Sequence, residues 1–119
     1  MLRRSALKPR KQNAPRAAWR VAEAFKQWLR GRPCACGGRG PHCDGRMEAA
    51  HVDYAGGKGI GLKVADRFCI PLTMGCHRHQ HNIGWTRFEK EVLRGSAVRM
   101  SGEYWVAWPG RRAWEADQQ

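Results

Sequence analysis

The sequence predicts a small α+β domain in which a metal site supplements a modest hydrophobic core. The length of 119 residues allows one domain and is too short for two of full size. Two short strand-like segments are separated by a glycine-rich loop and followed by a helical segment, which is the basis for the α+β class. Five cysteines are an odd count, and outside an exported protein this favours thiolate metal ligands over a disulfide framework.

The charge of the chain favours a polyanionic partner, with nucleic acid first among the candidates. There are 22 Lys and Arg against 10 Asp and Glu, giving a formal net charge of +12. Ten basic residues and one acidic residue precede Cys34, so +9 of that charge lies in residues 1–33. No apolar run approaches the roughly 20 residues of a membrane span, and no apolar segment follows the basic start. We therefore expect an intracellular, cytoplasmic protein without a membrane partner.

The N-terminal part reads as a basic arm followed by an amphipathic helix. Residues 1–13 contain almost nothing to bury, which predicts a flexible arm. Apolar residues then recur at spacings of three and four, predicting a helix over 14–30. We expect the arm to contact nucleic-acid phosphates through Arg3, Arg4, Arg10 and Lys11.

The remaining elements complete a single domain over 14–110. Residues 32–45 are rich in Gly, Pro and Cys and predict a loop folded around zinc. The segment 46–93 predicts a ββα core, with strands at 47–52 and 67–72 and a helix at 76–93 that is interrupted near Gly84. A C-terminal strand or hairpin is expected over 98–108, and 111–119 is expected to be a frayed tail.

Four of the five cysteines predict a structural zinc site. Two thiolates on a tight turn followed by glycines can grip zinc, and a cysteine just before a helix is favoured as a thiolate. Cys69 lies in a predicted apolar strand, where a small buried hydrophobic side chain is the favoured interpretation. Cys69 and His42 are the alternative candidates for a zinc ligand. Simply reduced thiols are the other interpretation. The predicted zinc ligands are Cys34, Cys36, Cys43 and Cys76.

A second group of candidate residues is formed by histidines. His77 and His81 are four apart, so they share one helical face and can hold one divalent ion, while His79 points elsewhere. A solvated His-rich turn, or zinc ligation by His77 beside Cys76, are the alternatives. His51 ends the first strand and has the pKa range of a general base near pH 7. Asp66 would orient the loop or the ring of His51, or else be a solvated turn carboxylate.

Three segments carry a resemblance to a known family: EAAHV at 48–52, GGKGIGLKVADRFCIPL at 56–72 and CHRHQH at 76–81. In their order they resemble the HNH nuclease superfamily, the His-Me finger or ββα-metal fold, and within it phage and prophage nucleases of the Ref-like recombination-enhancement group. The resemblance implies that His51 is the general base, that Asp66 takes a position often held by Asn, and that His77 and His81 hold the catalytic metal. Many relatives have an acidic or His ligand where Ala50 stands, and Cys where Thr73 stands.

These observations predict a metal-dependent HNH endonuclease that hydrolyses DNA phosphodiester bonds, double- or single-stranded, in phage or prophage recombination or repair within a bacterial cell. The expected cofactors are a structural Zn²⁺ and one catalytic divalent ion, Mg²⁺, Mn²⁺, Zn²⁺ or Ni²⁺. A recombinase or replication protein is a possible partner. The alternatives are a non-catalytic zinc-dependent nucleic-acid-binding module and a recombination accessory protein. Lys58, Lys63 and Arg67 are expected near the phosphate backbone, or otherwise are ordinary solvated charges.

Six tryptophans are many for this length. Trp19 and Trp28 are expected in the core because they lie on or near the apolar face of the first predicted helix. Trp105, Trp108 and Trp114 alternate with Arg111 and Arg112 and could stack on bases, although packing is favoured because a small core needs large side chains.

Overall fold

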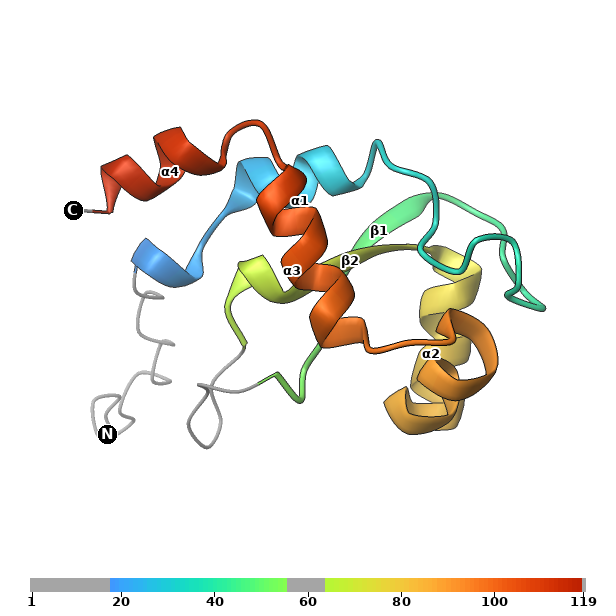
Figure 1. Ribbon diagram of the computed structural model, residues 1–119. Coiled ribbons are helices and arrows are strands. Elements are labelled where there is room, and N and C mark those ends of the chain that lie inside the picture. The colour runs from blue at the N-terminus through green and yellow to red at the C-terminus, as the bar shows by residue number, and fades with distance from the viewer. Residues whose placement is uncertain (1–17, 56–63, 119) are drawn as a thin grey trace, which may run out of the picture.

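A two-stranded antiparallel sheet lies between two groups of helices, so the predicted α+β class is confirmed. The computed structural model describes residues 18–55 and 64–118. Helix α2 covers one face of the sheet, and α1 and α3 cover the other (Figure 1). In chain order the elements are η1 (Ala18–Arg20), α1 (Glu23–Leu29), β1 (Met47–His51), η2 (Asp66–Phe68), β2 (Cys69–Thr73), α2 (Met74–Phe88), η3 (Glu89–Leu93), α3 (Ala97–Ala107) and α4 (Arg111–Asp117).

The register of the sheet decides which side chains share a face. Strand β1 pairs with β2 so that Glu48 lies opposite Leu72 and His51 lies opposite Cys69. Successive side chains of a strand point to opposite faces, so Glu48 and His51, three residues apart, lie on different faces. Glu48 shares its face with the apolar residues that pack under α2, whereas His51 shares its face with Cys69, which packs with α1 and α3.

The hydrophobic core is correspondingly divided into two clusters. The first lies between the sheet, α2 and η3 and is centred on Phe88, Ile70 and Leu72. The second lies between the sheet, α1 and α3 and contains Phe25 and Trp105, whose rings meet edge to face at 5.0 Å. Burying large side chains on both faces gives a two-stranded sheet the support that it lacks alone.

The central segment follows the predicted order of strand, loop, strand and helix, with shifted bounds. The second strand begins at residue 69 instead of 67 because 66–68 form a short 3₁₀ turn. Helix α2 begins at Met74 because the hydroxyl of Thr73 accepts a hydrogen bond from Cys76 N at 3.2 Å and caps it. The expected interruption occurs at Gly84, whose φ of 84° is a left-handed backbone conformation that glycine adopts readily.

The first helix is shorter than predicted. Instead of a continuous helix over 14–30, the described residues form the 3₁₀ turn η1 and then α1. The backbone N–H of Ala22 donates to Asp66 Oδ2 at 2.9 Å, and this contact with a residue far along the chain fixes Ala22 outside the helix. The predicted arm and residues 14–17 lie outside the described residues. The same holds for six of the predicted phosphate contacts, Arg3, Arg4, Arg10, Lys11, Lys58 and Lys63.

The prediction of a strand or hairpin over 98–108 was wrong, because residues 97–107 form helix α3. Ala97, Ser101 and Trp105 are buried at intervals of four residues, which is the period of a helix that packs one face on the core. Ser96 caps this helix by accepting a hydrogen bond from Arg99 N at 3.1 Å. Residues 111–117 form α4 rather than a frayed tail, since Trp114 packs edge-on against Trp105 at 5.1 Å.

The tryptophans divide differently from the expectation. Trp105 and Trp108 are buried in the second cluster, and Trp28 and Trp114 pack partly buried against it. Trp19 is not in the core, because 51% of its surface is exposed. The side chain lies on η1, which has no buried residue, so the apolar helical pattern was misleading there.

Candidate functional site

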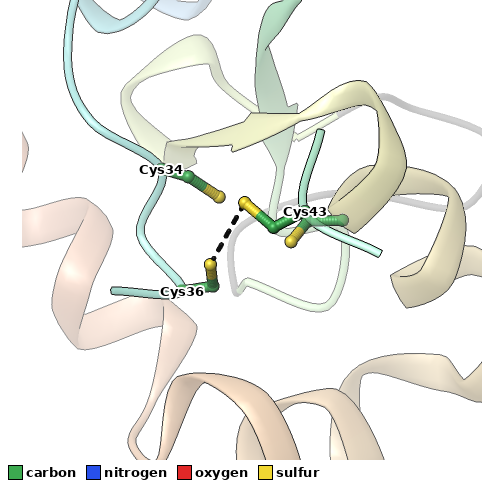
Figure 2. Close-up of side chains that lie close together, drawn as sticks. Cys34, Cys36 and Cys43 are labelled. Atoms are coloured by element: carbon green, nitrogen blue, oxygen red, sulfur yellow. Dashed lines mark hydrogen bonds between the residues drawn. The ribbon is translucent and has the colours of Figure 1, made fainter. Parts of the chain in front are cut away.

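The four thiols that the sequence predicts as one site lie together in the structure. The Sγ atoms of Cys34, Cys36, Cys43 and Cys76 are all within 4.8 Å of one another. Figure 2 shows the sulfurs of the three labelled residues, Cys34, Cys36 and Cys43, turned toward one another from the loop before β1. The fourth comes from the first turn of α2. Such a set could hold a structural metal such as zinc, which prefers four tetrahedral thiolate or imidazole ligands.

Backbone amides around the cluster donate hydrogen bonds to the sulfurs. Gly37 and Gly38 have φ values of 61° and 85°, and this left-handed turn lets Gly38 N donate to Cys36 Sγ at 3.3 Å. Thr73 N donates to Cys34 Sγ at 3.4 Å, and the Thr73 hydroxyl donates to Cys43 Sγ at 3.5 Å. Thr73 thus supports two of the sulfurs as a hydrogen-bond donor.

The surroundings of the thiols shift their pKa values in both directions. Burial raises the pKa of the Cys34 and Cys76 thiols. Burial acts in the same direction on Cys36, but hydrogen bonds with the Gly40 and Gly38 backbone amides and with the Cys43 thiol outweigh it and lower the pKa of the Cys36 thiol to about 7. A thiolate is the form that binds a metal, so the lowered pKa of Cys36 favours its metal-binding form.

Arg39 fastens this loop to the core. Its Nε donates to Val92 O at 2.8 Å and its Nη2 donates to Leu93 O at 3.0 Å. These carbonyls lie at the end of η3, where carbonyls lack helical partners. The thiol cluster is therefore joined to the first hydrophobic cluster at both the loop and α2.

The two alternative ligands lie elsewhere. Cys69 is fully buried in β2 within the second hydrophobic cluster, as a small hydrophobe would be. His42 places its ring 5.2 Å from that of His79, on the outer side of α2. Within residues 18–55 and 64–118, the four thiols form the group of possible metal ligands whose atoms all approach this closely, and it includes neither alternative.

Gly40 offers a direct test of the cluster, because a methyl group there would enter it. An added Cβ would lie 2.5 Å from Cys76 Sγ, so Gly40→Ala must displace a sulfur of the cluster. We expect this variant to lose most of its bound metal and to melt at least about 5 °C lower. A shift of this size corresponds to a loss of roughly 1 kcal/mol in the free energy of unfolding for a domain of this length. Metal analysis and thermal circular dichroism measure both effects.

Gly102→Ala is the matched control for this prediction. Its added Cβ meets nothing within 4 Å and lies in α3, so we expect unchanged metal content and an equal or slightly higher melting temperature. Wild-type metal content and melting in Gly40→Ala would contradict the assignment of these sulfurs to one metal site.

A second polar contact joins His51 to Asp66. His51 Nε2 lies 2.9 Å from Asp66 Oδ1, and the Asp66 side chain is completely buried. Its second oxygen accepts the hydrogen bond from Ala22 N and lies 3.6 Å from Lys26 Nζ. The solvated-carboxylate interpretation of Asp66 is therefore wrong, because burial and three contacts hold it against the partly exposed ring of His51.

On the other face of the sheet, His77 and His81 lie beside a carboxylate that the sequence analysis did not select. Their ring centroids are 4.9 Å apart, and His77 Nδ1 lies 2.7 Å from Glu48 Oε1. The hydrogen bond from His77, aided by Arg46, lowers the pKa of Glu48 below its usual range. These residues line an open pocket of about 390 Å³ together with Met74 and Arg78.

Glu48 could have been found from the strand alternation. It precedes His51 by three positions, so once β1 is assigned and α2 is placed over one face, Glu48 must face the helix that carries the two histidines. The structure thus forms two polar groups on opposite faces of the β1–β2 sheet. One joins His51 to Asp66, and the other joins His77 to Glu48 beside His81. Arg67 belongs to neither, since its guanidinium lies over the rings of Phe68 and Trp105 at 5.5 and 5.4 Å.

These features define a small α+β domain with a four-thiol cluster and two histidine-carboxylate contacts. A family model described as "Protein of unknown function (DUF968)" matches residues 10–115, so the chain belongs to the DUF968 family. No curated protein and no solved structure matches the chain. None of the helices in the described part of the chain has the length and apolar character needed to cross a membrane.

Proposed function

We propose that this protein is a metal-dependent endonuclease of the HNH superfamily that hydrolyses DNA phosphodiester bonds in phage or prophage recombination or repair. The observation that carries the proposal is the placement of polar groups on the β1-loop-β2-α2 segment. A histidine held by a buried carboxylate ends β1, and two histidines one helical turn apart lie on α2 beside Glu48. The net charge of +12 supports a nucleic-acid substrate.

The donor set on α2 suits a divalent ion. His77 and His81 offer two imidazoles from one helical face, and Glu48 accepts a hydrogen bond from His77 Nδ1, which leaves Nε2 as the ligand atom. Glu48 would thus orient a ligand in the way that carboxylates commonly support metal-binding histidines. A bound Mg²⁺, Mn²⁺, Zn²⁺ or Ni²⁺ would stabilise negative charge on the scissile phosphate and the leaving oxygen.

His51 would accept the proton of the attacking water. An ionised carboxylate only accepts hydrogen bonds, so Asp66 holds the proton on His51 Nε2 and leaves Nδ1 as the basic nitrogen. Because Asp66 is buried and bonded to Ala22 N, the ring is held in one orientation. Proton transfer to a base fixed in this way is a general contribution to hydrolysis at neutral pH.

The placement of these groups on opposite faces of the hairpin fits one substrate position. Within the described residues β1 pairs with β2 alone, so the other edge of β1 has no strand partner there. A phosphodiester lying across that edge would meet His51 from one side and the pocket of His77 and His81 from the other.

The test is cleavage of supercoiled plasmid and single-stranded DNA with each of the four metals. We expect cleavage with at least one metal, and a strong loss in His81→Ala that partly recovers at high metal concentration, because one imidazole and the substrate phosphate still attract the ion. Metal held by the thiols should stay unchanged in this variant. Cleavage is measured by gel assay and metal content by atomic absorption.

Asn82→Ala is the matched control, since Asn82 is the exposed neighbour of His81 on α2 and lines a different pocket. It should cleave at the wild-type rate. Absence of cleavage with all four metals, in protein that carries thiol-bound metal and binds DNA, would refute the nuclease and favour the non-catalytic zinc-dependent module. Unfolding of His81→Ala with loss of that metal would show that His81 belongs to the structural site.

A further inference from the structure

A groove of about 350 Å³ at the end of the molecule away from α2 combines aromatic surface with positive charge. It lies between η1, the residues around η2, and α4, which is the red helix at one end of Figure 1. Its lining includes Trp19, Arg20, Arg67, Phe68, Trp114 and Glu115. None of these residues takes part in the thiol cluster or in the pocket of His77 and His81.

The two tryptophans of the groove differ in how they are packed and exposed. Trp114 is fixed, because its Nε1 donates to Val21 O at 2.9 Å and its ring packs against Trp105. Trp19 is half exposed, and its ring carries the Arg20 guanidinium 4.5 Å from its centroid. A large aromatic side chain left exposed beside a guanidinium is the arrangement on which nucleobases stack in single-strand binding proteins.

The charge of the groove is positive. Arg67 is held over Phe68 and Trp105, and Arg20 lies over Trp19. The acidic lining residue Glu115 is paired with Arg111 at 3.0 Å, so it does not offset these cations at full strength. Guanidinium groups that lie over aromatic rings, next to the half-exposed Trp19, match a ligand that joins a planar ring to a phosphate, which is a nucleotide.

The groove adjoins the residue that holds His51. Ala65 and Arg67 line it, and Asp66 between them turns inward to His51 Nε2. We propose that this groove binds one unpaired nucleobase of a single-stranded or locally unpaired nucleic acid, close to the His51 side of the hairpin. The proposal rests on the proposed function for the source of the strand, whereas binding of the base can be measured without cleavage.

The test compares Trp19→Ala with Val106→Ala, both made in a His51→Ala background so that the strand is not cut. Val106 is the exposed apolar control, with 67% of its surface accessible on α3 outside the groove. By fluorescence anisotropy, Trp19→Ala should bind a short oligothymidylate about tenfold more weakly, as loss of one stacked base predicts. Its affinity for a matched duplex should change less than about twofold, because paired bases cannot enter the groove. Val106→Ala should resemble the parent on both ligands.

Arg67→Gln provides a second measurement, with Arg99→Gln on the exposed side of α3 as the charge control. We expect Arg67→Gln to weaken oligothymidylate binding more than Arg99→Gln does, and the Trp19 effect to vanish on an oligonucleotide whose bases are replaced by abasic sites. Equal losses on single strand and duplex, or unchanged oligonucleotide affinity in Trp19→Ala, would overturn the proposal and leave the groove to a protein partner. Base-dependent binding by a protein that never cleaves DNA would refute the proposed nuclease function and leave the proposed nucleobase groove standing.

Discussion

Replacing Cys76 by Ser is expected to release the bound metal and to unfold the domain at room temperature. Cys76 is fully buried and is the thiol of the cluster that comes from α2, whereas the other three come from the loop before β1. Structural zinc contributes an apparent free energy of about 10–16 kcal/mol in small zinc domains, which is comparable with the roughly 5–15 kcal/mol stability of a typical domain. Metal analysis of the purified protein and circular dichroism measure the two effects.

Cys69→Ala is the matched control, because Cys69 is equally buried but lies in the second hydrophobic cluster. It should keep its metal and lose only about 1 kcal/mol from the small cavity it leaves. Since an unfolded Cys76→Ser variant yields little soluble protein, wild type is also stripped with a chelator and reloaded with Co²⁺, whose thiolate absorption reports the ligands. Metal-free wild type with an unchanged melting transition, or loss of metal in Cys69→Ala, would contradict the four-thiol site.

The second large effect is expected from His51→Ala, which should lower the rate of DNA cleavage by about 10²-fold to 10⁴-fold, the usual loss on removing a general base. The pocket of His77 and His81 on the other face of the hairpin does not contain His51, so we expect binding of a divalent ion and of DNA to persist. Single-turnover cleavage and DNA binding, measured on the same preparations, separate chemistry from affinity.

His79→Ala serves as the imidazole control for this experiment. His79 lies on α2 near His77 and His81 in sequence, but its ring packs against His42 and Phe88. Its rate should stay within about threefold of wild type, as for a residue outside the chemistry. A wild-type rate in His51→Ala would remove His51 from the mechanism, and with it the HNH assignment of the strand.

The features that the sequence predicted correctly depend on local patterns. The strand, loop, strand and helix order of 46–93 follows from apolar runs, glycines and a helical segment, all readable within a few residues. The grouping of the four cysteines followed from their loop and helix-start positions, and the structure places their sulfurs together. The i, i+4 spacing likewise put His77 and His81 on one face of α2.

The features that the sequence missed depend on contacts between distant segments. The sequence predicts a strand or hairpin over 98–108, but residues 97–107 form helix α3, in which Trp105 packs against Phe25 and lies under the Arg67 guanidinium. The same packing orders α4 through Trp114. The first helix begins late because Ala22 N is bonded to Asp66, 44 positions away in the chain. Local propensity cannot anticipate any of these contacts.

By itself, the sequence determined the α+β class, the candidate ligands and the basic character, because residue type and near-neighbour spacing fix all three. Only the tertiary structure decided how the candidates combine. Pairing of β1 with β2 sets Glu48 toward α2 and His51 toward Asp66, and burial converts Asp66 from a loop carboxylate into the partner of that ring. The physical reason is that strand register and the packing of helices on the two faces of a sheet arise from contacts far apart in the chain.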